Sequence, residues 1–584
     1  MARKQGQWSV LAVNGTVAVA VLVLVAVLAL VVKPPAPPGI AAFAPQASKP
    51  ITKAPLAQSA QFGTGSGQCG AGQVCALRPT ATPTASLPPG VTPTALPTIA
   101  RGVPSALQCY TWPNGTVTQT YDPQSPPCIA TWDDTKGNGG ATWPGVTGTE
   151  IRVAEPVNST VPLNTLQPIV DFFNTRFQLY GRKIKLVTFT SQQANQQYKG
   201  TGLNDPSLQR ADAAAVTQLK VFAAMDFIDP LPGSWALPAY RDTLMKHKIL
   251  SLSGGEVPPY GTASDLAGKA PYEWTYYPTL DTVMDGTANM VCRQLAGRKA
   301  QYAKGTDPVN GPVADKVRKF AVVLPEEQFI GGPMPGLTSL QHTLAGCGAP
   351  ASTVVRYDPN DANKTSALTA SMQQLKRDGI TSVVFVPFTG AANPYSAQKA
   401  ADRAQFYPEW VTVGWSKYNA DYQLNGPAQE TNATFGIAPW NKMPAYALEF
   451  WWRAYLDGGG DSSGAVNSGR AFYNELLMLA SGIQLAGPHL TPQSLAAGLQ
   501  STTFPNPGAA GPPYYQATVG FTPGDATMVN DLSQFWLDTR TSAQGLASSK
   551  NLSNTDAECY ALLGRRWTPD DWPAQDSYYR GGCR

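Results

Sequence analysis

Two consecutive strand–loop–helix units over residues 316–388 place the strongest constraint on the fold of this 584-residue chain. The first unit opens with an apolar run of strand length, KVRKFAVVL at 316–324. The second contains a predicted helix over 365–378, where apolar residues recur at helical spacing, and a fully apolar strand at 380–388. Strands that are apolar on both faces and alternate with helices predict a parallel sheet covered by helices on both sides.

The strand ends of such a sheet are the first place to look for function. Ligands bind parallel sheets in crevices outside the carboxyl ends of the strands. In this chain those ends include the loops that follow Leu324 and Phe388. We therefore expect a binding site to be built from loops of this kind.

The charge composition argues against a nucleic-acid-binding protein. Charged residues make up 14% of the chain, against roughly 25% in typical soluble domains. The formal net charge is +4, and Lys and Arg occur only singly or in short runs. A nucleic-acid-binding surface needs a cluster of basic residues, so we expect no nucleic-acid partner.

An apolar run at residues 16–32 (TVAVAVLVLVAVLALVV) predicts a transmembrane anchor. With the residues before it, the run reaches the roughly 20 residues that a membrane-spanning helix needs. Arg3 and Lys4 precede it, and positive charge favours the cytoplasmic side. The expectation is a single-pass protein of the cell membrane, with residues 1–15 in the cytoplasm and the C-terminal domain extracellular.

A cleaved signal peptide is the alternative interpretation of the same run. Ala42 and Ala44 place small residues in the pattern of a cleavage site, but they lie well beyond the apolar run and directly before Pro45. No cysteine follows the run closely, which argues against a lipoprotein anchor. The uncleaved anchor is therefore the expectation, with cleavage left open.

The segments that flank the predicted domain differ from it in composition. Residues 33–105 are rich in Pro, Ala and Thr and are predicted to be a disordered linker, because they cannot bury enough apolar surface to offset the entropy of ordering. Residues 106–146 carry two cysteines and many turn residues and predict a small disulfide-tied lead-in. Residues 541–584 form a polar tail with two more cysteines.

The eight cysteines suggest disulfides, because the chain is predicted to be exported and the count is even. Sequence alone leaves the pairing open. The local pairing that we expect is Cys69–Cys75, Cys109–Cys128, Cys292–Cys347 and Cys559–Cys583. A buried free thiol is the alternative for Cys292.

Patterns typical of enzymes are weak in this sequence. The GxSxG match at 460–464 follows a predicted helix instead of a strand, and the glycines at 331–336 lack the lysine of a phosphate-binding loop. The adjacent Glu326 and Glu327 remain a candidate acid–base pair. Histidines occur only at His247, His342 and His489, without zinc-site spacing. We expect no enzyme activity, no cofactor and no metal site.

The order of elements over about 147–540 resembles bacterial type I periplasmic solute-binding proteins of the branched-chain amino-acid (leucine-binding-protein-like) kind, which serve ABC transporters. The resemblance lies in five features: Gly145-Val146-Thr147 before the first strand, Tyr277-Pro278 and Asp281 at the entry to a long helix, the strand–loop with Glu326, Glu327, Gln328 and Phe329, the unit formed by a helix, Gly379 and the strand 380–388, and the apolar helix 470–485 followed by 491–499. No single motif is diagnostic.

This resemblance implies an α/β fold of two Rossmann-like lobes, with parallel sheets flanked by helices, that close on a solute. It implies lobe one at about 147–274 and 435–510, and lobe two at about 275–434 and 511–540, with 435–439 crossing between them. The implied function is a membrane-anchored extracellular receptor for a small molecule, acting in ABC-type uptake with a permease partner or in sensing.

The ligand-binding loops that the resemblance implies lie after strand ends in both lobes, and the loops after Ile228 and Leu324 are expected to face each other. In lobe one they contribute Asp229, Ser234, Trp235, Ser253 and Gly254, and in lobe two Tyr277, Glu326, Gln328, Phe329 and Phe388.

One departure from the family bears on the ligand. The family's amino-acid receptors carry small hydroxyl residues after the third strand, whereas this chain has Pro230, Leu231 and Pro232. Proline has no N–H to donate to a carboxylate. Many aromatic residues surround the implied site, which favours an apolar, aromatic or sugar-like solute. An adhesive or structural surface module that keeps the fold without a ligand is the alternative.

The anchor leads to a direct test. If residues 16–32 remain in the mature protein, membrane fractions should contain the chain with its N-terminus intact, because the apolar helix holds it in the bilayer. N-terminal peptide mapping by mass spectrometry measures this. A soluble mature protein that begins near Pro45 would contradict the anchor and favour a signal peptide.

Overall fold

The computed structural model describes residues 109–157, 166–198, 205–226, 238–254, 261–303, 306–307, 311–327, 332–358, 365–387, 394–414, 433–439, 449–461, 469–507, 517–537, 558–560 and 566–574. The expected anchor, the linker at 33–105, the pair Cys69–Cys75 and Cys583 lie outside these ranges. No helix within them combines the length and apolar character that crossing a membrane requires.

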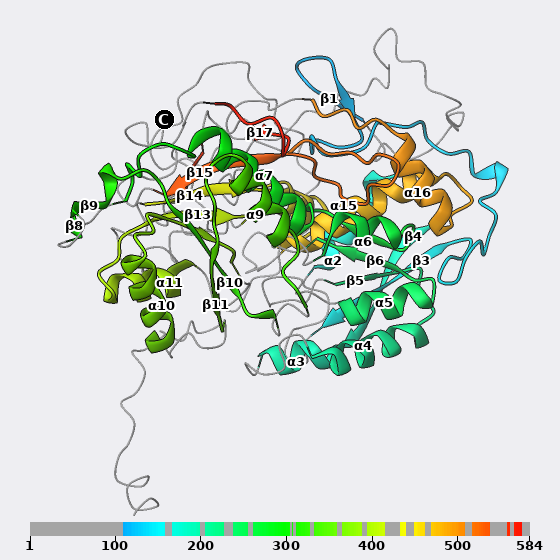
Figure 1. Cartoon of the computed structure of the whole chain (residues 1–584). Coiled ribbons are helices and arrows are strands. Elements are labelled where there is room, and N and C mark those ends of the chain that lie inside the picture. Colours follow the sequence, from blue (N-terminus) through cyan, green and yellow to red (C-terminus); the bar gives the residue numbers. More distant parts are fainter. Residues whose placement is uncertain are drawn as a thin grey trace, which may run out of the picture. The chain divides into compact units, whose positions relative to one another are not determined.

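A five-stranded parallel sheet forms the centre of the first α/β unit (Figure 1). Its strand order is β4-β3-β5-β6-β7, so the first strand of the unit lies inside the sheet and the chain winds outward from it in both directions. The strands are β3 (Glu150–Val157), β4 (Lys183–Thr190), β5 (Ala223–Met225), β6 (Leu250–Ser253) and β7 (Glu273–Thr275).

Helices cover both faces of this sheet, as its central strands require, because β5 and β6 are buried along their whole length. On one face lie α4 (Pro206–Gln218) and α5 (Pro238–Lys246), which pack against each other. The other face is covered by α2 (Gln167–Arg176), α14 (Phe450–Asp457), α15 (Gly469–Ala486) and α16 (Pro492–Ser501). The short helices α3 (Gln192–Tyr198) and α6 (Ala263–Gly268) complete the unit.

Helix α15 is the most deeply buried helix of this face. Fifteen of its 18 residues are buried, among them Phe472, Leu476 and Met478. A helix that is apolar nearly all round belongs in a core, and the sequence-based helix at 470–485 coincides with it. The following helix α16 begins with a capping box, in which Thr491 and Ser494 satisfy each other's backbone N–H groups.

The second unit contains a larger sheet in the order β11-β10-β12-β13-β14-β15-β16, with β17 also paired to β15. Its parallel strands are β10 (Phe320–Pro325), β11 (Thr353–Tyr357), β12 (Ser382–Phe385), β13 (Glu409–Val413) and β14 (Thr434–Ala438). Three antiparallel strands extend it, β15 (Leu532–Leu537), β16 (Glu558–Tyr560) and β17 (Arg566–Trp567).

Two pairs of helices pack with this sheet, α7 (Leu280–Gln294) with α9 (Leu337–Gly346) and α10 (Thr365–Arg377) with α11 (Pro394–Arg403). The chain also has the short hairpin β8 (Thr306–Asp307) and β9 (Gly311–Pro312). The predicted α/β class, with parallel sheets flanked by helices, is confirmed.

One segment differs from the sequence-based expectation. Residues 435–439 are expected to cross between the lobes, but Thr434–Ala438 is β14, a buried strand paired in parallel with β13. All five residues of TFGIA are buried, so the segment suits the interior of a sheet better than an exposed crossing. Within the tail, β16 and β17 extend the second sheet.

The chain passes between the two units three times. Residues 276–279 connect β7 of the first sheet to α7 of the second unit. After β14 the chain returns to α14 in the first unit. Residues 517–529 stay with the first unit, where Thr527 bridges Thr275, and β15 then joins the second sheet. Each unit is therefore assembled from separate parts of the chain.

The lead-in packs on the first unit. Its hairpin β1 (Tyr110–Thr111) and β2 (Val117–Thr118) lies beside the disulfide Cys109–Cys128, and a second disulfide joins Cys292 and Cys347 in the second unit. Arg182 holds the end of the lead-in through carbonyl oxygens, at 2.5 Å from Asn138 and 3.1 Å from Gly140.

A buried carboxyl group fixes the middle of the lead-in. Asp122 accepts a hydrogen bond from the Tyr473 hydroxyl at 2.8 Å and from the Gln124 backbone N–H at 2.9 Å. Gln124 in turn contacts the Tyr276 hydroxyl and donates to the Ala517 carbonyl at 3.1 Å. Burial raises the pKa of Asp122 from 3.8 to about 6, although both hydrogen bonds favour its charged form.

This raised pKa predicts a measurable pH dependence. Because the folded-state pKa of Asp122 lies above the unfolded value, its contribution to stability is fully present below pH 3.8 and is lost as pH rises through about 6. The difference amounts to about 3 kcal/mol. Urea unfolding of the wild type and of Asp122→Asn between pH 3 and pH 8 should show that the variant lacks this part of the pH dependence. The same pH dependence of stability in the wild type and in the variant would contradict the raised pKa of Asp122.

Candidate functional site

Polar groups gather at the carboxyl ends of three neighbouring strands of the first sheet. Asp226 follows β5, Ser253 ends β6 and is followed by Gly254, and Thr275 ends β7. The parallel pairing sets Met225 beside Leu252 and Ser253 beside Thr275, so these strand ends lie at one edge. Ligands bind at such an edge in open α/β sheets, which makes it the candidate site in the first unit.

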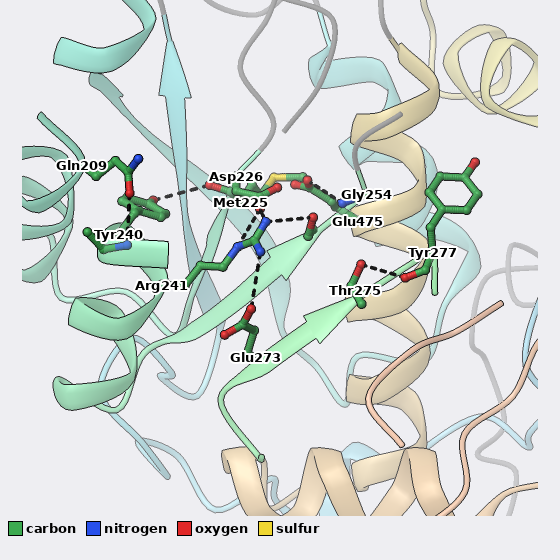
Figure 2. A network of polar contacts seen from close by, with 12 residues as sticks. Gln209, Met225, Asp226, Tyr240, Arg241, Gly254, Glu273, Thr275, Tyr277 and Glu475 are labelled. Atoms are coloured by element: carbon green, nitrogen blue, oxygen red, sulfur yellow. Dashed lines mark hydrogen bonds and ion pairs between the residues drawn. The ribbon is translucent and has the colours of Figure 1, made fainter. Parts of the chain in front are cut away.

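Arg241 of α5 joins these strand ends through its guanidinium group (Figure 2). Its Nε and Nη2 donate to Asp226 Oδ2 at 3.1 and 2.5 Å, and Nη2 also lies 3.3 Å from Ser253 Oγ. Its Nη1 lies 3.4 Å from Glu273 Oε1 on β7. Burial works against the charged guanidinium, but the carboxylates of Asp226 and Glu273 outweigh it and raise the pKa of Arg241. The protein's own carboxylates therefore engage this cation.

The position of α5 explains why Arg241 reaches the sheet. Tyr240, Arg241 and Leu244 form the buried face of the helix. The Tyr240 hydroxyl donates to the Met225 carbonyl at 3.4 Å, and the backbone N–H of Ala239 donates to Gln209 Oε1 on α4 at 3.0 Å. These contacts prevent α5 from turning about its axis, so that Arg241 points toward the ends of β5 and β6 (Figure 2).

Glu475 approaches the same edge from α15. One carboxyl oxygen, Oε1, accepts a hydrogen bond from the Gly254 backbone N–H at 2.9 Å. Its carboxyl group also interacts with that of Asp226, and both side chains are fully buried. Among the described residues, Asp226 Oδ1 and Glu475 Oε2 have no N–H or O–H donor other than each other's carboxyl group. Two ionised carboxylates cannot donate, so one of them keeps a proton.

The proton belongs on Glu475. Burial raises the pKa of Glu475 well above its ordinary value, and the neighbouring charge of Asp226 raises it further. Burial raises the pKa of Asp226 as well, but there Arg241 opposes the shift. With Glu475 neutral, Arg241 faces the two buried carboxylates of Asp226 and Glu273. The half-buried Lys269 adds a second positive charge, which Glu273 at 3.2 Å shares with the more exposed Asp242 at 3.0 Å.

Tyr277 lies at the same edge, beyond the end of β7. Its backbone carbonyl accepts a hydrogen bond from Thr275 Oγ1 at 3.1 Å, and its hydroxyl accepts one from Asn474 Nδ2 at 3.4 Å. The ring is 2% exposed and packs in the core of the first unit. The sequence assigns Tyr277 to the second lobe, whereas the structure places it with the first because β7 is the fifth strand of that sheet.

In the second unit, Glu326 occupies the corresponding place directly after β10. It is half-buried, and its backbone N–H donates to the Tyr357 carbonyl at 2.9 Å. The adjacent Glu327 is exposed and forms an ion pair with Arg356 at 2.7 Å. Glu327 is therefore engaged at the surface, which weakens the interpretation of the two glutamates as an acid–base pair.

Six of the ten sequence-predicted site residues lie outside the described residues. They are Asp229, Ser234, Trp235, Gln328, Phe329 and Phe388. The approach of the loops after Ile228 and Leu324 to each other stays a prediction. Of the other four, the structure brings Ser253, Gly254 and Tyr277 to one edge, while Glu326 lies in the second unit.

The sequence interpretation did not include Asp226, Arg241 or Glu475. Two of them carry a signal that could have been used: Asp226 ends the apolar run VFAAM, and Glu475 is the only acidic residue in the apolar helix 470–485. Arg241 carries none, since a basic residue in an amphipathic helix is common. Among the described residues, no group of three His, Cys, Asp or Glu residues is placed to hold a metal ion.

No protein-family model matches the sequence, and no curated protein matches it. The chain is similar to a solute-binding protein of an ABC transporter from R. palustris in complex with 4-hydroxybenzoate, with 14% identity, a TM-score of 0.47, and coverage of 72% of this chain and 98% of that one.

It is also similar to a branched-chain amino-acid ABC transporter protein from Thermus thermophilus with bound valine, with 13% identity, a TM-score of 0.44, and coverage of 67% and 94%. The matching structures are type I periplasmic solute-binding proteins of ABC transporters, the family that the sequence resembles. The two-unit fold itself rests on the strand order and crossings of this chain.

Two substitutions separate the roles of the buried charges. Arg241→Met should lower the free energy of unfolding by roughly 3–5 kcal/mol, because it leaves Asp226 and Glu273 buried without their shared cation. Glu475→Gln should change it by less than about 1 kcal/mol at neutral pH, because a neutral amide replaces a neutral acid and can still accept from Gly254 and donate to Asp226. Urea unfolding measures both.

The free energies of unfolding of the wild type and of Glu475→Gln should also differ in alkaline solution. A folded-state pKa raised above the unfolded value gives stability that is lost as pH rises through the folded-state pKa. The wild type should therefore weaken with increasing pH relative to Glu475→Gln. If Arg241→Met and Glu475→Gln lowered the free energy of unfolding equally at neutral pH, Glu475 would be ionised, contrary to this assignment.

Proposed function

We propose that this chain is an extracellular solute-binding receptor, held at the cell membrane by residues 16–32, whose two α/β units close on a small molecule. The observation that carries the proposal is the paired architecture. Two sheets of the same winding order are joined by three crossings, and in each the parallel strands end at a common carboxyl edge. In such sheets only the strand ends are free of covering helices, so they are the surfaces open to a ligand.

The chemistry of the first unit's edge favours a solute that is recognised through apolar or aromatic surface and hydrogen bonds. The guanidinium of Arg241 is already engaged by Asp226 and Glu273, so it does not serve as a cation for a ligand's carboxylate. In the adjacent loop, Pro230 and Pro232 have no N–H to donate. Aromatic residues in the candidate loops, Trp235 and Phe329, supply flat apolar surface.

The partner in this proposal is an ABC permease that accepts the solute from the closed receptor. The predicted anchor and linker, residues 16–32 and 33–105, would keep the receptor close to such a permease. A sensing role needs the same binding step and differs only in the membrane partner. The binding step is therefore the part to test first.

A thermal-shift screen of amino acids, amides, sugars and aromatic acids tests the binding step. A ligand that binds only the folded protein adds about 2.7 kcal/mol of stability at a concentration of 100 times its Kd. For a compound that raises the melting temperature, Phe329→Ala and Trp235→Ala should each weaken binding by roughly 1–3 kcal/mol through lost aromatic burial, as measured by calorimetry. The unfolding midpoint without ligand should change little.

Trp143→Ala is the matched control. Trp143 belongs to the lead-in, and its indole donates to the Lys248 carbonyl at 3.3 Å, just before β6 and thus at the opposite end of the strand. Its loss should leave ligand affinity unchanged. Failure of the whole panel to stabilise the protein would instead favour a surface module without a ligand. Equal effects of Trp143→Ala and Phe329→Ala would remove the site from the carboxyl ends.

A further inference from the structure

A short C-terminal segment packs across the second unit at the places where the chain leaves and re-enters it. We call this segment, residues 566–574, the brace. Its first two residues are β17, which pairs Trp567 with Leu532 and Arg566 with Ser533 at the beginning of β15. Trp567 and Trp572 are both buried in the core of the second unit, with ring centroids 5.5 Å apart. The brace is thus a packed part of that unit.

Arg566 makes the central contact of the brace. Its Nε donates to Asp531 Oδ1 at 2.6 Å, and its Nη2 donates to the backbone carbonyls of Asp531 at 2.7 Å and Pro439 at 2.8 Å. The side chains of Arg566 and Asp531 are only 6% and 10% exposed. Charge-assisted hydrogen bonds of this geometry are strong and directional, so the guanidinium fixes both carbonyls relative to each other.

Both partners of Arg566 stand at crossings of the chain. Pro439 directly follows β14, where the chain leaves the second unit, and Asp531 directly precedes β15, where the chain returns. The Asp531 carboxylate also accepts hydrogen bonds from the backbone N–H of Thr518, at 3.2 and 3.0 Å. Thr518 belongs to the segment 517–529 that packs on the first unit. One ion pair therefore connects two crossings and contacts both units.

The other end of the brace contacts the helix that follows the remaining crossing. Asn289 of α7 donates to the Pro569 carbonyl at 3.2 Å and to Asp570 Oδ1 at 3.0 Å. Packing is close at this place, because a Cβ atom added to Gly286 of α7 would lie 2.6 Å from Leu532 Cδ1 and 3.6 Å from Pro569 Cα. Helix α7 begins directly after residues 276–279. The brace thus meets elements next to all three crossings.

We propose that Arg566 is a positioning residue for closure: it holds the crossing segments at Pro439 and Asp531 and thereby sets the angle at which the two units rest. This inference rests on the proposed function, in which the units close on a solute. Hinge motion is absorbed by a few residues between rigid parts. A buried guanidinium that binds two such segments limits the angles they adopt, so its loss should widen the range of inter-unit angles.

The test measures distances in the protein without any ligand. Spin labels are attached to unnatural amino acids at Gln218 on α4 and Gln373 on α10, which are both exposed. This pair reports the distance between the units, and the labelling leaves the cysteines untouched. A second pair, at Thr338 on α9 and Gln373, reports on the fold of the second unit alone. Pulsed electron–electron double resonance measures the distribution of label-to-label distances for each pair.

Arg566→Gln should broaden or shift the inter-unit distribution and leave the distribution within the second unit unchanged. The matched control is Arg356→Gln, which removes an arginine from a 2.7 Å ion pair with Glu327 that lies wholly inside the second unit. The control should leave both distributions as in the wild type. An unchanged inter-unit distribution in a folded Arg566→Gln protein would overturn the proposal, and so would an equal change in Arg356→Gln.

A second variant covers the case in which Arg566→Gln does not fold. Asp531→Asn keeps an oxygen that can accept from Thr518 and removes only the charge that faces Arg566. It should produce the same inter-unit change, and an unchanged distribution in this variant would overturn the proposal. Because no ligand is used, the outcome is separate from the solute screen: either proposal can fail while the other stands.

Discussion

The first unit depends on a helix that the chain supplies only after it has built most of the second. Helix α15 lies in the core beneath β6 and β7, with 15 of its 18 residues buried, yet about two hundred residues of sequence separate it from those strands. Without α14, α15 and the segment 517–529, part of one face of the first sheet would be exposed apolar surface. Long-range closure of this kind costs loop entropy before its contacts form, so the core of the first unit depends on contacts between residues far apart in the sequence.

Helix α15 also brings the acidic residue Glu475 into the core, where burial favours its protonated form. Three carboxyl groups and one guanidinium meet at the ends of β5 and β6 and at the neighbouring strand β7. If all were ionised, the buried negative charge would exceed the positive charge, which is costly where water is absent. A neutral Glu475 reduces this excess and lets its carboxyl group donate to Asp226. Arg241 then acts as a support of the strand ends, placed behind the edge where a ligand would bind.

The sequence was sufficient for the fold class and for the position of two residues at the carboxyl edge of the first sheet. Two-sided apolar strands such as 380–388 and the all-round apolar helix at 470–485 leave few alternatives to a covered parallel sheet. Ser253 and Gly254 could be placed at an edge because a strand end is visible as the end of an apolar run. Strand β14 was missed because a short apolar segment that directly precedes a crossing is not separated from that crossing by any signal in the sequence. The pairing of Arg241 with Asp226 and the contact of Glu475 with Gly254 depend on which helix faces turn inward, and this is set by contacts between distant segments.

The attachment of the lead-in gives the two units different mechanical roles. Residues 109–146 are fastened to the first unit through the Asp122 carboxyl, Gln124 and the carbonyl oxygens that Arg182 holds. Among the described residues, the chain therefore begins on the first unit. In the proposed receptor, closure on a solute would therefore be a movement of the second unit relative to a first unit that also carries the lead-in. The predicted linker at 33–105 would let the two units turn together at the membrane surface.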